Sequence, residues 1–337
     1  MPRVDIAIPC YQYGRFLRDS VGSVLSQDIG DVRVLIIDNA STDDSLAVAR
    51  ALAAEDRRVE ILAHPDNLGP HASFNRGIDW AASDYFMILC ADDVLLPSAL
   101  SRAVAIMDRH PEVGLAYGRA DQIRGDAYRV DQAGPSPDLG WRVLPGAALL
   151  DRFCRTGICH VPGCAALVRT SVQKQVGHYR VELPHTDDFE LWMRFAAQGA
   201  VAETDTLQAL SRVHDANRSA PVRSDHTQDI LHCEAAFDSF FAREGATLPR
   251  GREMRRMARR SLGARAYWSG LSHLGRGHFG PGRSLLRQAL RLSPSTAILP
   301  PLGYLWHRDD LAARLGHIGG EVVGRSRAPL KAARADG

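Results

Sequence analysis

The stretch Tyr85-Phe-Met-Ile-Leu-Cys-Ala-Asp-Asp93 decides how the rest of this 337-residue chain is interpreted. Seven uncharged residues are followed by two adjacent carboxylates, which is the pattern of a buried strand that ends in Asp92 and Asp93. Carboxylates this close repel each other unless a metal ion, a proton or a basic side chain intervenes. The stretch therefore predicts a strand that delivers a cation site to the edge of a sheet.

A helix cap ahead of Pro97 is the structural alternative, but it accounts for one of these aspartates and not for both. Mg²⁺ and Mn²⁺ take few protein carboxylates and complete their shells with water and phosphate oxygens. We therefore expect Asp92 and Asp93 to hold Mg²⁺ or Mn²⁺ against a phosphate-bearing substrate.

Strand-like and helix-like segments alternate through the first 120 residues around this stretch. The expected strands are residues 4–10, 32–38, 59–64, 85–90 and 113–117, and the expected helices are 15–27, 43–54, 70–82 and 97–109. Such alternation predicts an α/β fold with a doubly wound, mostly parallel sheet and helices on both faces. In these sheets ligands bind beyond the carboxyl ends of the strands, where Asp38 and the Asp92–Asp93 pair fall.

The second half of the chain predicts a different organisation. Residues 118–146 are rich in loop-forming residues, 164–169 and 201–214 are extended, and 187–198 form an amphipathic helix. From about residue 225 the pattern is helical, with segments at 226–244, 251–273 and 281–292. We expect a catalytic domain over residues 1–222, a helical carboxyl-terminal appendage over 223–316 and a disordered basic tail over 317–337.

Charge is unevenly distributed along the chain, although the net charge is only +2. From Arg250 onward there are 17 Lys and Arg against 5 Asp and Glu, whereas the preceding residues hold 24 against 34. Arg255, Arg256, Arg259 and Arg260 cluster within two helical turns. Contact with an anionic membrane surface and an ordinary solvated helix face both explain this cluster.

Other features of the composition favour a cytoplasmic protein. No run approaches the roughly 20 apolar residues that span a bilayer, and the start of the chain has no signal-peptide pattern. Six cysteines without a Cys-x-x-Cys pair suit a reducing compartment. We therefore expect a cytoplasmic location, with peripheral attachment at the inner face of the membrane as a further hypothesis, and no nucleic-acid partner.

The loops after the first two expected strands offer groups that bind nucleosides. The first loop lacks the Gly-x-Gly-x-x-Gly fingerprint of dinucleotide-binding enzymes but contains Pro9 and Tyr11. Tyr11 suits stacking on a base, and a packed aromatic in a tight turn explains it equally well. Asp38 and Asn39 can hydrogen-bond a pyrimidine edge or a ribose hydroxyl. Because Ser41 and Thr42 are expected to cap the next helix, Asp38 is free for a ligand.

Two later segments carry further candidates. Asp188, in the first turn of the helix expected at 187–198, is either a general base or a partner of the helix dipole, and the segment alone does not decide between them. Arg212 and His214 share a face of the following extended segment. Together they can contact a diphosphate.

These pieces resemble, in order and spacing, the inverting family 2 glycosyltransferases with a GT-A fold. The resemblance runs from Val4 to about Ser219. Its motifs are Ile8-Pro-Cys-Tyr11, Ile37-Asp-Asn-Ala-Ser-Thr-Asp43, Asn67-Leu-Gly69, Asn75-Arg-Gly77, Ala91-Asp-Asp93, Asp187-Asp-Phe-Glu-Leu-Trp192 and Arg212-Val-His214.

The resemblance implies a role for each matching residue. Asp188 is the expected catalytic base, and Asp93, Asp92 and His214 are the expected metal ligands. The residues expected to bind the sugar nucleotide are Pro9, Tyr11, Asp38, Asn39, Asn67, Asp92, Arg212 and His214. The implied reaction moves a sugar from a nucleoside-diphosphate donor to a hydroxyl of a saccharide or lipid-linked saccharide, in synthesis of surface polysaccharide, lipopolysaccharide or cell wall.

Three positions depart from the usual family pattern. Asn39 replaces a second aspartate that often reads the base, so UDP is the default and dTDP and GDP stay open. Cys90 replaces the first aspartate of the usual Asp-x-Asp-Asp motif, and Phe74 replaces an arginine.

Two other classes stay open, namely a nucleotidyltransferase that makes sugar nucleotides and a sugar-nucleotide-binding protein without turnover. The loop after the first strand has only one glycine, which argues against the nucleotidyltransferase. The presence of Asp92, Asp93 and Asp188 together argues against a binding protein without turnover.

Overall fold

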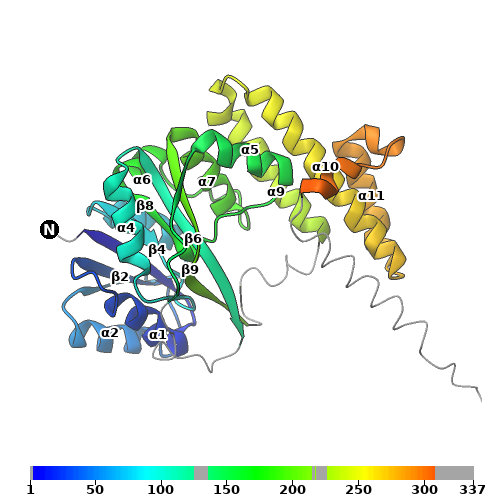
Figure 1. Ribbon diagram of the computed structural model, residues 1–337. Coiled ribbons are helices and arrows are strands. Elements are labelled where there is room, and N and C mark those ends of the chain that lie inside the picture. The colour runs from blue at the N-terminus through cyan, green and yellow to red at the C-terminus, as the bar shows by residue number, and fades with distance from the viewer. Residues whose placement is uncertain (1–2, 125–135, 215–216, 218–225, 308–337) are drawn as a thin grey trace, which may run out of the picture. The chain divides into compact units, whose positions relative to one another are not determined.

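A computed structural model describes residues 3–124, 136–214, 217 and 226–307 (Figure 1). The chain divides into two compact units, Met1–Arg259 and Arg260–Gly337, and each is described by itself. The domain boundary expected between residues 222 and 223 and the tail expected over 317–337 lie outside the described residues. Both stay predictions.

The first unit is built on one mixed sheet. Its strands are β1 (Val4–Cys10), β2 (Val32–Asp38), β3 (Val59–Ala63), β4 (Tyr85–Ile88), β5 (Val94–Leu95), β6 (Val113–Arg124), β7 (Arg142–Pro145), β8 (Ala166–Arg169) and β9 (Ala200–Val213). The order is β3-β2-β1-β4-β8-β6-β9-β5, with β7 also pairing with β9. The β3-β2-β1-β4 half is parallel throughout, and β6 pairs in parallel with β9, while the other pairings are antiparallel. The predicted α/β fold is confirmed.

The register of the central strands brings the candidate residues to one edge. Cys10 of β1 pairs with Asp38 of β2, and β1 also runs parallel to β4. The carboxyl ends of these three strands therefore meet, and the segment Cys90–Asp93 follows β4 at that edge. This is the edge at which parallel α/β sheets bind ligands.

Helices cover the sheet on both faces (Figure 1). The helices of the first unit are α1 (Gly14–Leu25), α2 (Ser45–Glu55), α3 (Pro70–Trp80), α4 (Ala99–Arg109), α5 (Gly146–Thr156), α6 (Thr170–Val176), α7 (Asp187–Gln198), α9 (His226–Ala242) and the start of α10 (Gly251–Gly275), whereas α11 (Phe279–Leu292) belongs to the second unit. Apolar side chains of α1, α2 and α4 form one core with Ile6, Ile8, Val34 and Ile36. The alternate strand residues face the other way, where α3 packs.

Helix α3 lies so close to the sheet that Gly77 has no room for a side chain. A β-carbon built at Gly77 would sit 2.5 Å from the Ala7 Cβ and 3.7 Å from the Ile37 Cδ1. This contact packs α3 closely against the middle of β1.

The loop expected over residues 118–146 is in part a strand, so that expectation was wrong. β6 continues to Arg124, where it pairs with Val213, and residues 142–145 form β7. Gly118, which the sequence presents as the start of a loop, is a point of close approach inside β6. A β-carbon there would lie 2.3 Å from the Gln208 Cγ. Backbone pairing with β9 outweighs the polar, loop-like composition of 119–124.

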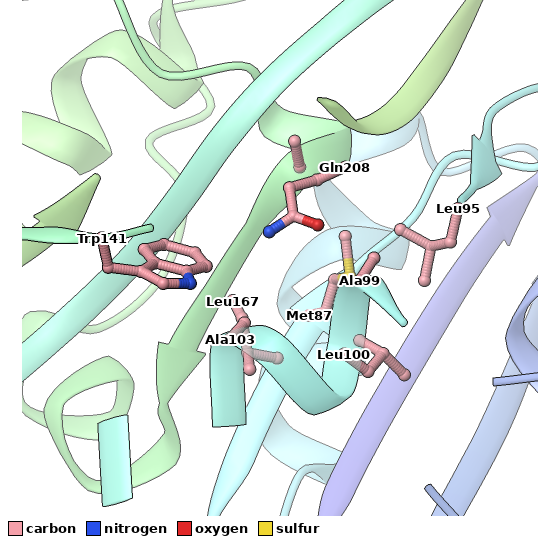
Figure 2. Close-up of a pocket in the computed structure, with 9 residues that line it drawn as sticks. Met87, Leu95, Ala99, Leu100, Ala103, Trp141, Leu167 and Gln208 are labelled. Atoms are coloured by element: carbon pink, nitrogen blue, oxygen red, sulfur yellow. The ribbon is translucent and has the colours of Figure 1, made fainter. Parts of the chain in front are cut away.

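A small cavity under α4 belongs to this packing and not to a ligand site. Figure 2 shows Gln208 of β9 lying among apolar side chains that include Met87, Leu100 and Trp141. The space is about 10 Å³, which is at the lower limit for one water molecule. Gln208 Oε1 accepts a hydrogen bond from Arg102 Nη2 at 2.7 Å, so the polar group is anchored from the helix side.

The second unit contains the end of α10, all of α11 and two short 3-10 helices, Pro294–Ala297 and Leu302–His307. The two α-helices cross closely where Gly270 faces Gly282, and Leu262, Leu285 and Ala289 are buried. Among the described residues, no helix is both long and apolar enough to cross a membrane.

Candidate active site

A cavity of about 760 Å³ opens at the carboxyl edge of the sheet, and we call it the edge cavity. Its lining comes from the loops after β1, β2, β3 and β4 and from the end of β9. The lining residues are Pro9, Cys10, Tyr11, Gln12, Tyr13, Asn39, Asn67, Gly69, Pro70, Ser73, Phe74, Cys90, Asp92, Asp93, Ser211 and Asn217. Six of the residues predicted from sequence therefore line one cavity.

The two aspartates of the opening stretch are anchored in a tight turn. The Asp93 backbone N–H donates to the Cys90 carbonyl at 3.0 Å, and Asp93 Oδ1 accepts from the Arg212 backbone N–H at 3.1 Å. Asp92 Oδ2 accepts from Asn217 Nδ2 at 3.0 Å and lies 3.2 Å from His214 Nε2. The end of β9 thus fixes both carboxylates.

Burial makes the ionised pair costly. Burial and the neighbouring Asp92 carboxylate raise the pKa of Asp93 to about 8. Burial also raises the pKa of Asp92, against the opposing influence of His214 and Arg212. A divalent cation would relieve both effects, because it supplies the positive charge that a buried carboxylate pair lacks. The residues present therefore fit a cation site.

The thiol of Cys90 lies with these carboxylates. One ligand atom each from Cys90, Asp92 and Asp93 lie within 4.8 Å of one another. His214 is not part of this group. Its ring packs edge-on against Tyr13, with centroids 5.2 Å apart, and its Nε2 faces Asp92. In this arrangement His214 positions Asp92, and its role as a metal ligand stays a prediction.

Arg212 and His214 both pack against the Phe16 ring, so they share a face as strand alternation predicts, but the Arg212 side chain points into the protein. That side chain is fully buried, with the guanidinium 4.7 Å from the Phe16 ring and Nε donating to the Asp92 carbonyl at 3.2 Å. Nη2 lies 3.4 Å from Asp19 Oδ2. Arg212 therefore supports the backbone under the aspartate pair, and its side chain does not line the edge cavity as a diphosphate ligand would.

The loop after β1 carries Tyr11 to the mouth of the edge cavity, where the ring is 44% exposed. This exposure favours a stacking surface over the packed aromatic that was the alternative. Gln12, which the sequence did not single out, ties this loop to the one after β2. Its Oε1 accepts from the Asp43 backbone N–H at 3.0 Å, and its Nε2 donates to Thr42 Oγ1 at 2.8 Å. Its positive φ of 61° was a signal that only the structure provides.

Asp38 lies buried at the end of β2 next to this cavity. Oδ2 accepts from the Ser41 backbone N–H at 3.1 Å, while Oδ1 is buried without a hydrogen-bond partner among the described residues. The predicted cap by Ser41 and Thr42 is wrong, because α2 begins at Ser45 and the Ser41 hydroxyl accepts from the Gln12 N–H instead. Asp38 Oδ1 is left without a partner in the described part of the chain, but Asp38 is not among the residues that line the edge cavity, so its role in ligand binding stays a prediction.

Asn39 and Asn67 shape the wall of the cavity together. Asn39 Nδ2 donates to Asn67 Oδ1 at 2.8 Å, and Asn39 Oδ1 accepts from the Leu68 backbone N–H at 3.0 Å. His64 Nδ1 lies 3.0 Å from the same oxygen. Much of the hydrogen-bonding capacity of Asn39 therefore serves the loop before α3.

A second cavity, of about 680 Å³, lies next to the amino end of α7, and we call it the helix cavity. It is lined by the predicted base Asp188 and by its neighbour Asp187, with Tyr179 and Trp192 among its aromatic residues. Asp188 is half-buried, and its Oδ1 accepts from the Phe189 backbone N–H at 2.6 Å. This contact holds the carboxylate at the start of the helix.

The two cavities share a wall. Phe74, Cys90, Asp93 and Ser211 line both of them. A ligand in the edge cavity and a ligand in the helix cavity would therefore approach each other next to Asp93. No local sequence pattern indicates this shared wall, since its members come from three separate segments.

A buried pair that the sequence did not reveal links α3 to α7. His71 Nε2 lies 3.0 Å from Asp187 Oδ2, with both side chains at most 10% exposed. The two atoms are within ion-pair distance, but no hydrogen bond joins them. We therefore treat the pair as an electrostatic contact that places Asp187 beside Asp188.

Comparison with known proteins agrees with this arrangement. The model for glycosyl transferase family 2 matches residues 5–177, which is more than half of the chain. The putative glycosyltransferase EpsE of Bacillus subtilis is 28% identical over 203 residues, covering 59% of this chain and 68% of EpsE. An uncharacterized glycosyltransferase of Rickettsia felis is 25% identical over 71% of this chain. The chain spans between 38% and 65% of the length of three Rickettsia relatives.

Solved structures share the fold. S. aureus TarS 1–349 in complex with UDP has a TM-score of 0.56 at 16% identity, covering 99% of this chain and 95% of that one. The mannosyltransferase PcManGT from Pyrobaculum calidifontis, in complex with GDP-Man and Mn²⁺, has a TM-score of 0.56 at 15% identity, covering 96% and 81%. With the GT-A fold and the matching family model, the chain belongs to glycosyltransferase family 2.

Proposed function

We propose that this protein transfers a sugar from a nucleoside-diphosphate-sugar donor to an acceptor hydroxyl with inversion at the anomeric carbon. The observation that carries the proposal is the shared wall at Asp93. A donor in the edge cavity would place its sugar toward the helix cavity, where Asp188 stands beside the acceptor. Holding two reactants in this way supplies much of the rate enhancement of a transferase.

The proposed donor site uses the loops at the carboxyl edge of the sheet. Tyr11 offers a ring face to the base, and the unsatisfied Asp38 Oδ1 accepts from the base or the ribose. Pro9, Asn39 and Asn67 complete the wall. TarS binds UDP and UDP-GlcNAc, and PcManGT binds GDP-Man, so the class of donor is supported while the base is not. UDP is our default, with dTDP and GDP as the other candidates.

Mn²⁺ or Mg²⁺ is the proposed cofactor, held by Asp93 and Asp92. When bound, the ion would neutralise charge on the departing diphosphate. His214, Arg212 and Asn217 keep the two carboxylates in place, as their contacts with this pair indicate. The solved structure of PcManGT is a complex with Mn²⁺, which supports the type of ion.

Asp188 is the proposed general base. It would accept the acceptor hydroxyl proton while that oxygen bonds to the anomeric carbon and the bond to the diphosphate breaks. A single displacement of this kind inverts the anomeric configuration and needs no enzyme nucleophile. The contact between His71 and Asp187 would hold the start of α7 in position for this step.

The acceptor we propose is a saccharide or lipid-linked saccharide of a surface polysaccharide, lipopolysaccharide or cell-wall glycan. The basic carboxyl-terminal region suggests peripheral contact with an anionic membrane, where such acceptors reside. Two arginines of the basic cluster are engaged elsewhere, because Arg255 pairs with Asp238 at 2.7 Å and Arg259 with Glu234 at 3.4 Å. Electrostatic attraction to an anionic membrane would therefore depend on Arg256, Arg260 and the basic residues that follow them in the sequence.

A thermal-shift screen tests the donor proposal most broadly. UDP-, dTDP- and GDP-sugars are compared with and without Mn²⁺, because a ligand that binds only the folded state raises the melting temperature. We expect one base to stabilise the protein, and only with the cation present. No stabilisation by any of the three would contradict the proposal. Binding of a nucleoside triphosphate with a sugar phosphate, and product formation from them, would favour a nucleotidyltransferase instead.

A further inference from the structure

The turn after β4 carries a third potential metal ligand besides its two aspartates. The ligand atoms of Cys90, Asp92 and Asp93 all lie within 4.8 Å of one another. Two ligands of one zinc-sized ion, at about 2.3 Å for sulfur and 2.0–2.2 Å for oxygen, stand at most about 4.5 Å apart. The bound of 4.8 Å lies just above this maximum, so the three atoms are close enough for one ion to contact all of them once the turn contracts.

The turn itself explains why Cys90 reaches this position. The hydrogen bond from the Asp93 N–H to the Cys90 carbonyl, at 3.0 Å, closes the turn. The same carbonyl accepts from Ser20 Oγ at 3.3 Å, which ties the turn to α1. Arg212 and Asn217 fix the carboxylates from the side of β9. These contacts hold the turn and its carboxylates in place before a metal ion binds.

We propose that Cys90 Sγ is a third protein ligand of the cation site, so that the site prefers thiophilic divalent ions over Mg²⁺. This inference rests on the cation site of the proposed function and extends it. Thiolate is a soft ligand that selects Zn²⁺, Cd²⁺ and Co²⁺, whereas carboxylates alone suit Mg²⁺ and Mn²⁺. One sulfur and two oxygens leave coordination positions open, as catalytic sites require. Binding would release the thiol proton to solvent.

Cobalt absorption provides a readout that is independent of activity. The full-length protein is titrated with Co²⁺ alone and again with UDP present, and the sulfur-to-cobalt charge-transfer band is recorded in the near ultraviolet. We expect the wild-type band to saturate at one equivalent of Co²⁺. Cys90→Ser is expected to bind without the band and to lose at least about tenfold in Cd²⁺ affinity.

Two matched variants identify the sulfur. Cys164 lines the helix cavity beside Cys90, and Cys154 is buried in α5. Cys164→Ala and Cys154→Ala are both expected to keep the cobalt band. Cys90→Asp, which restores the third carboxylate, is expected to raise Mn²⁺ affinity above that of the wild type, and circular dichroism checks that each variant folds.

Two results would overturn the inference, namely a wild-type protein that binds Co²⁺ without the band and a Cys90→Ser variant that keeps it. Mn²⁺ binding, followed by electron paramagnetic resonance, separates this failure from that of the proposed function. Mn²⁺ bound at Asp92 and Asp93 without a cobalt band would refute the role of Cys90 and leave the proposed cation site standing. Absence of binding by both ions, with UDP present, would refute both.

Discussion

In the metal-free protein, the buried Asp93 carboxyl is more stable protonated than ionised. Burial and Asp92 raise its pKa from 3.8 to about 8. Because the folded state holds this proton more tightly than the unfolded chain, the stability due to Asp93 is present at low pH and is lost as pH rises from about 4 to 8. A functional site of this kind is expected to be destabilising until its ligand arrives.

Asp93→Asn should therefore stabilise the metal-free protein at high pH. In EDTA at pH 9 we expect the variant to exceed the wild type by roughly 1–3 kcal/mol of unfolding free energy, with the difference vanishing toward pH 4. Urea denaturation across this range measures it. The exposed Asp84→Asn, whose side chain is 68% exposed, is the control and should stay within about 0.5 kcal/mol of wild type. A less stable Asp93→Asn at pH 9 would contradict the burial argument.

Asp188→Asn tests the proposed base directly. The amide keeps the shape of the side chain but does not accept the acceptor proton, so we expect turnover to fall by about 10²–10⁴-fold. Donor affinity, measured by calorimetry, should stay within about twofold, because Asp188 lines the helix cavity and not the edge cavity. Wild-type turnover by this variant would remove Asp188 from the role of base.

For single residues, the sequence predicted which residue types form the site better than it predicted where their side chains point. The sequence identified Asp92, Asp93 and Tyr11, which line the edge cavity as expected. It did not show that the Arg212 side chain turns inward, because strand alternation gives a face and not a rotamer. The pair of His71 and Asp187 joins residues 116 positions apart, and no local pattern announces such a contact.

Gln12 joins the two loops that follow β1 and β2 and lie next to the edge cavity. Its side chain accepts from the Asp43 backbone and donates to Thr42, and its backbone sits at φ 61°. Gln12→Gly allows that backbone conformation and removes the three side-chain hydrogen bonds, including the one from the Thr42 backbone N–H to Oε1 at 3.3 Å. We expect donor affinity to fall by about 3–10-fold, consistent with hydrogen bonds of about 1 kcal/mol each. Calorimetry with the preferred nucleotide measures this, and unchanged affinity would show that the brace is irrelevant to the donor site.

The packing of α3 on the sheet gives a matched pair of glycine substitutions. Gly77→Ala places a methyl group 2.5 Å from the Ala7 Cβ, so we expect a loss of about 1–3 kcal/mol. Gly22→Ala, in α1, meets nothing within 4 Å and should be neutral or stabilising by up to about 1 kcal/mol. Urea midpoints compare the two. Equal midpoints would mean that α3 is not held as closely as described.

Helices and strands with a regular pattern of apolar residues were predictable from the sequence, and the others were not. The strand at 32–38 and the helix at 187–198 match β2 and α7, because apolar runs and helical spacing there agree with the tertiary structure. The extension of β6 to Arg124 was missed because its partner, β9, lies about 90 residues away in sequence. Long-range pairing of this kind overrides local composition.

The whole chain combines an acidic first part with a basic end. We expect more co-sedimentation with vesicles that contain anionic lipid than with neutral vesicles, and less at high salt, because basic residues near such a surface add about 1 kcal/mol each. Arg256→Glu with Arg260→Glu should reduce this binding, whereas Arg18→Glu, on α1, should not. Equal sedimentation with both vesicle types would end the membrane hypothesis.

At the scale of the whole molecule, we propose that the aspartate pair holds a cation, which in turn holds a nucleoside diphosphate. Isothermal titration calorimetry of UDP, or of the base that the screen selects, tests it with Mn²⁺ and with EDTA. We predict binding at least about tenfold tighter with Mn²⁺ for the wild type and no metal effect for Asp93→Asn. Equal affinity in Mn²⁺ and EDTA, or a metal effect that survives in Asp93→Asn, would contradict the account.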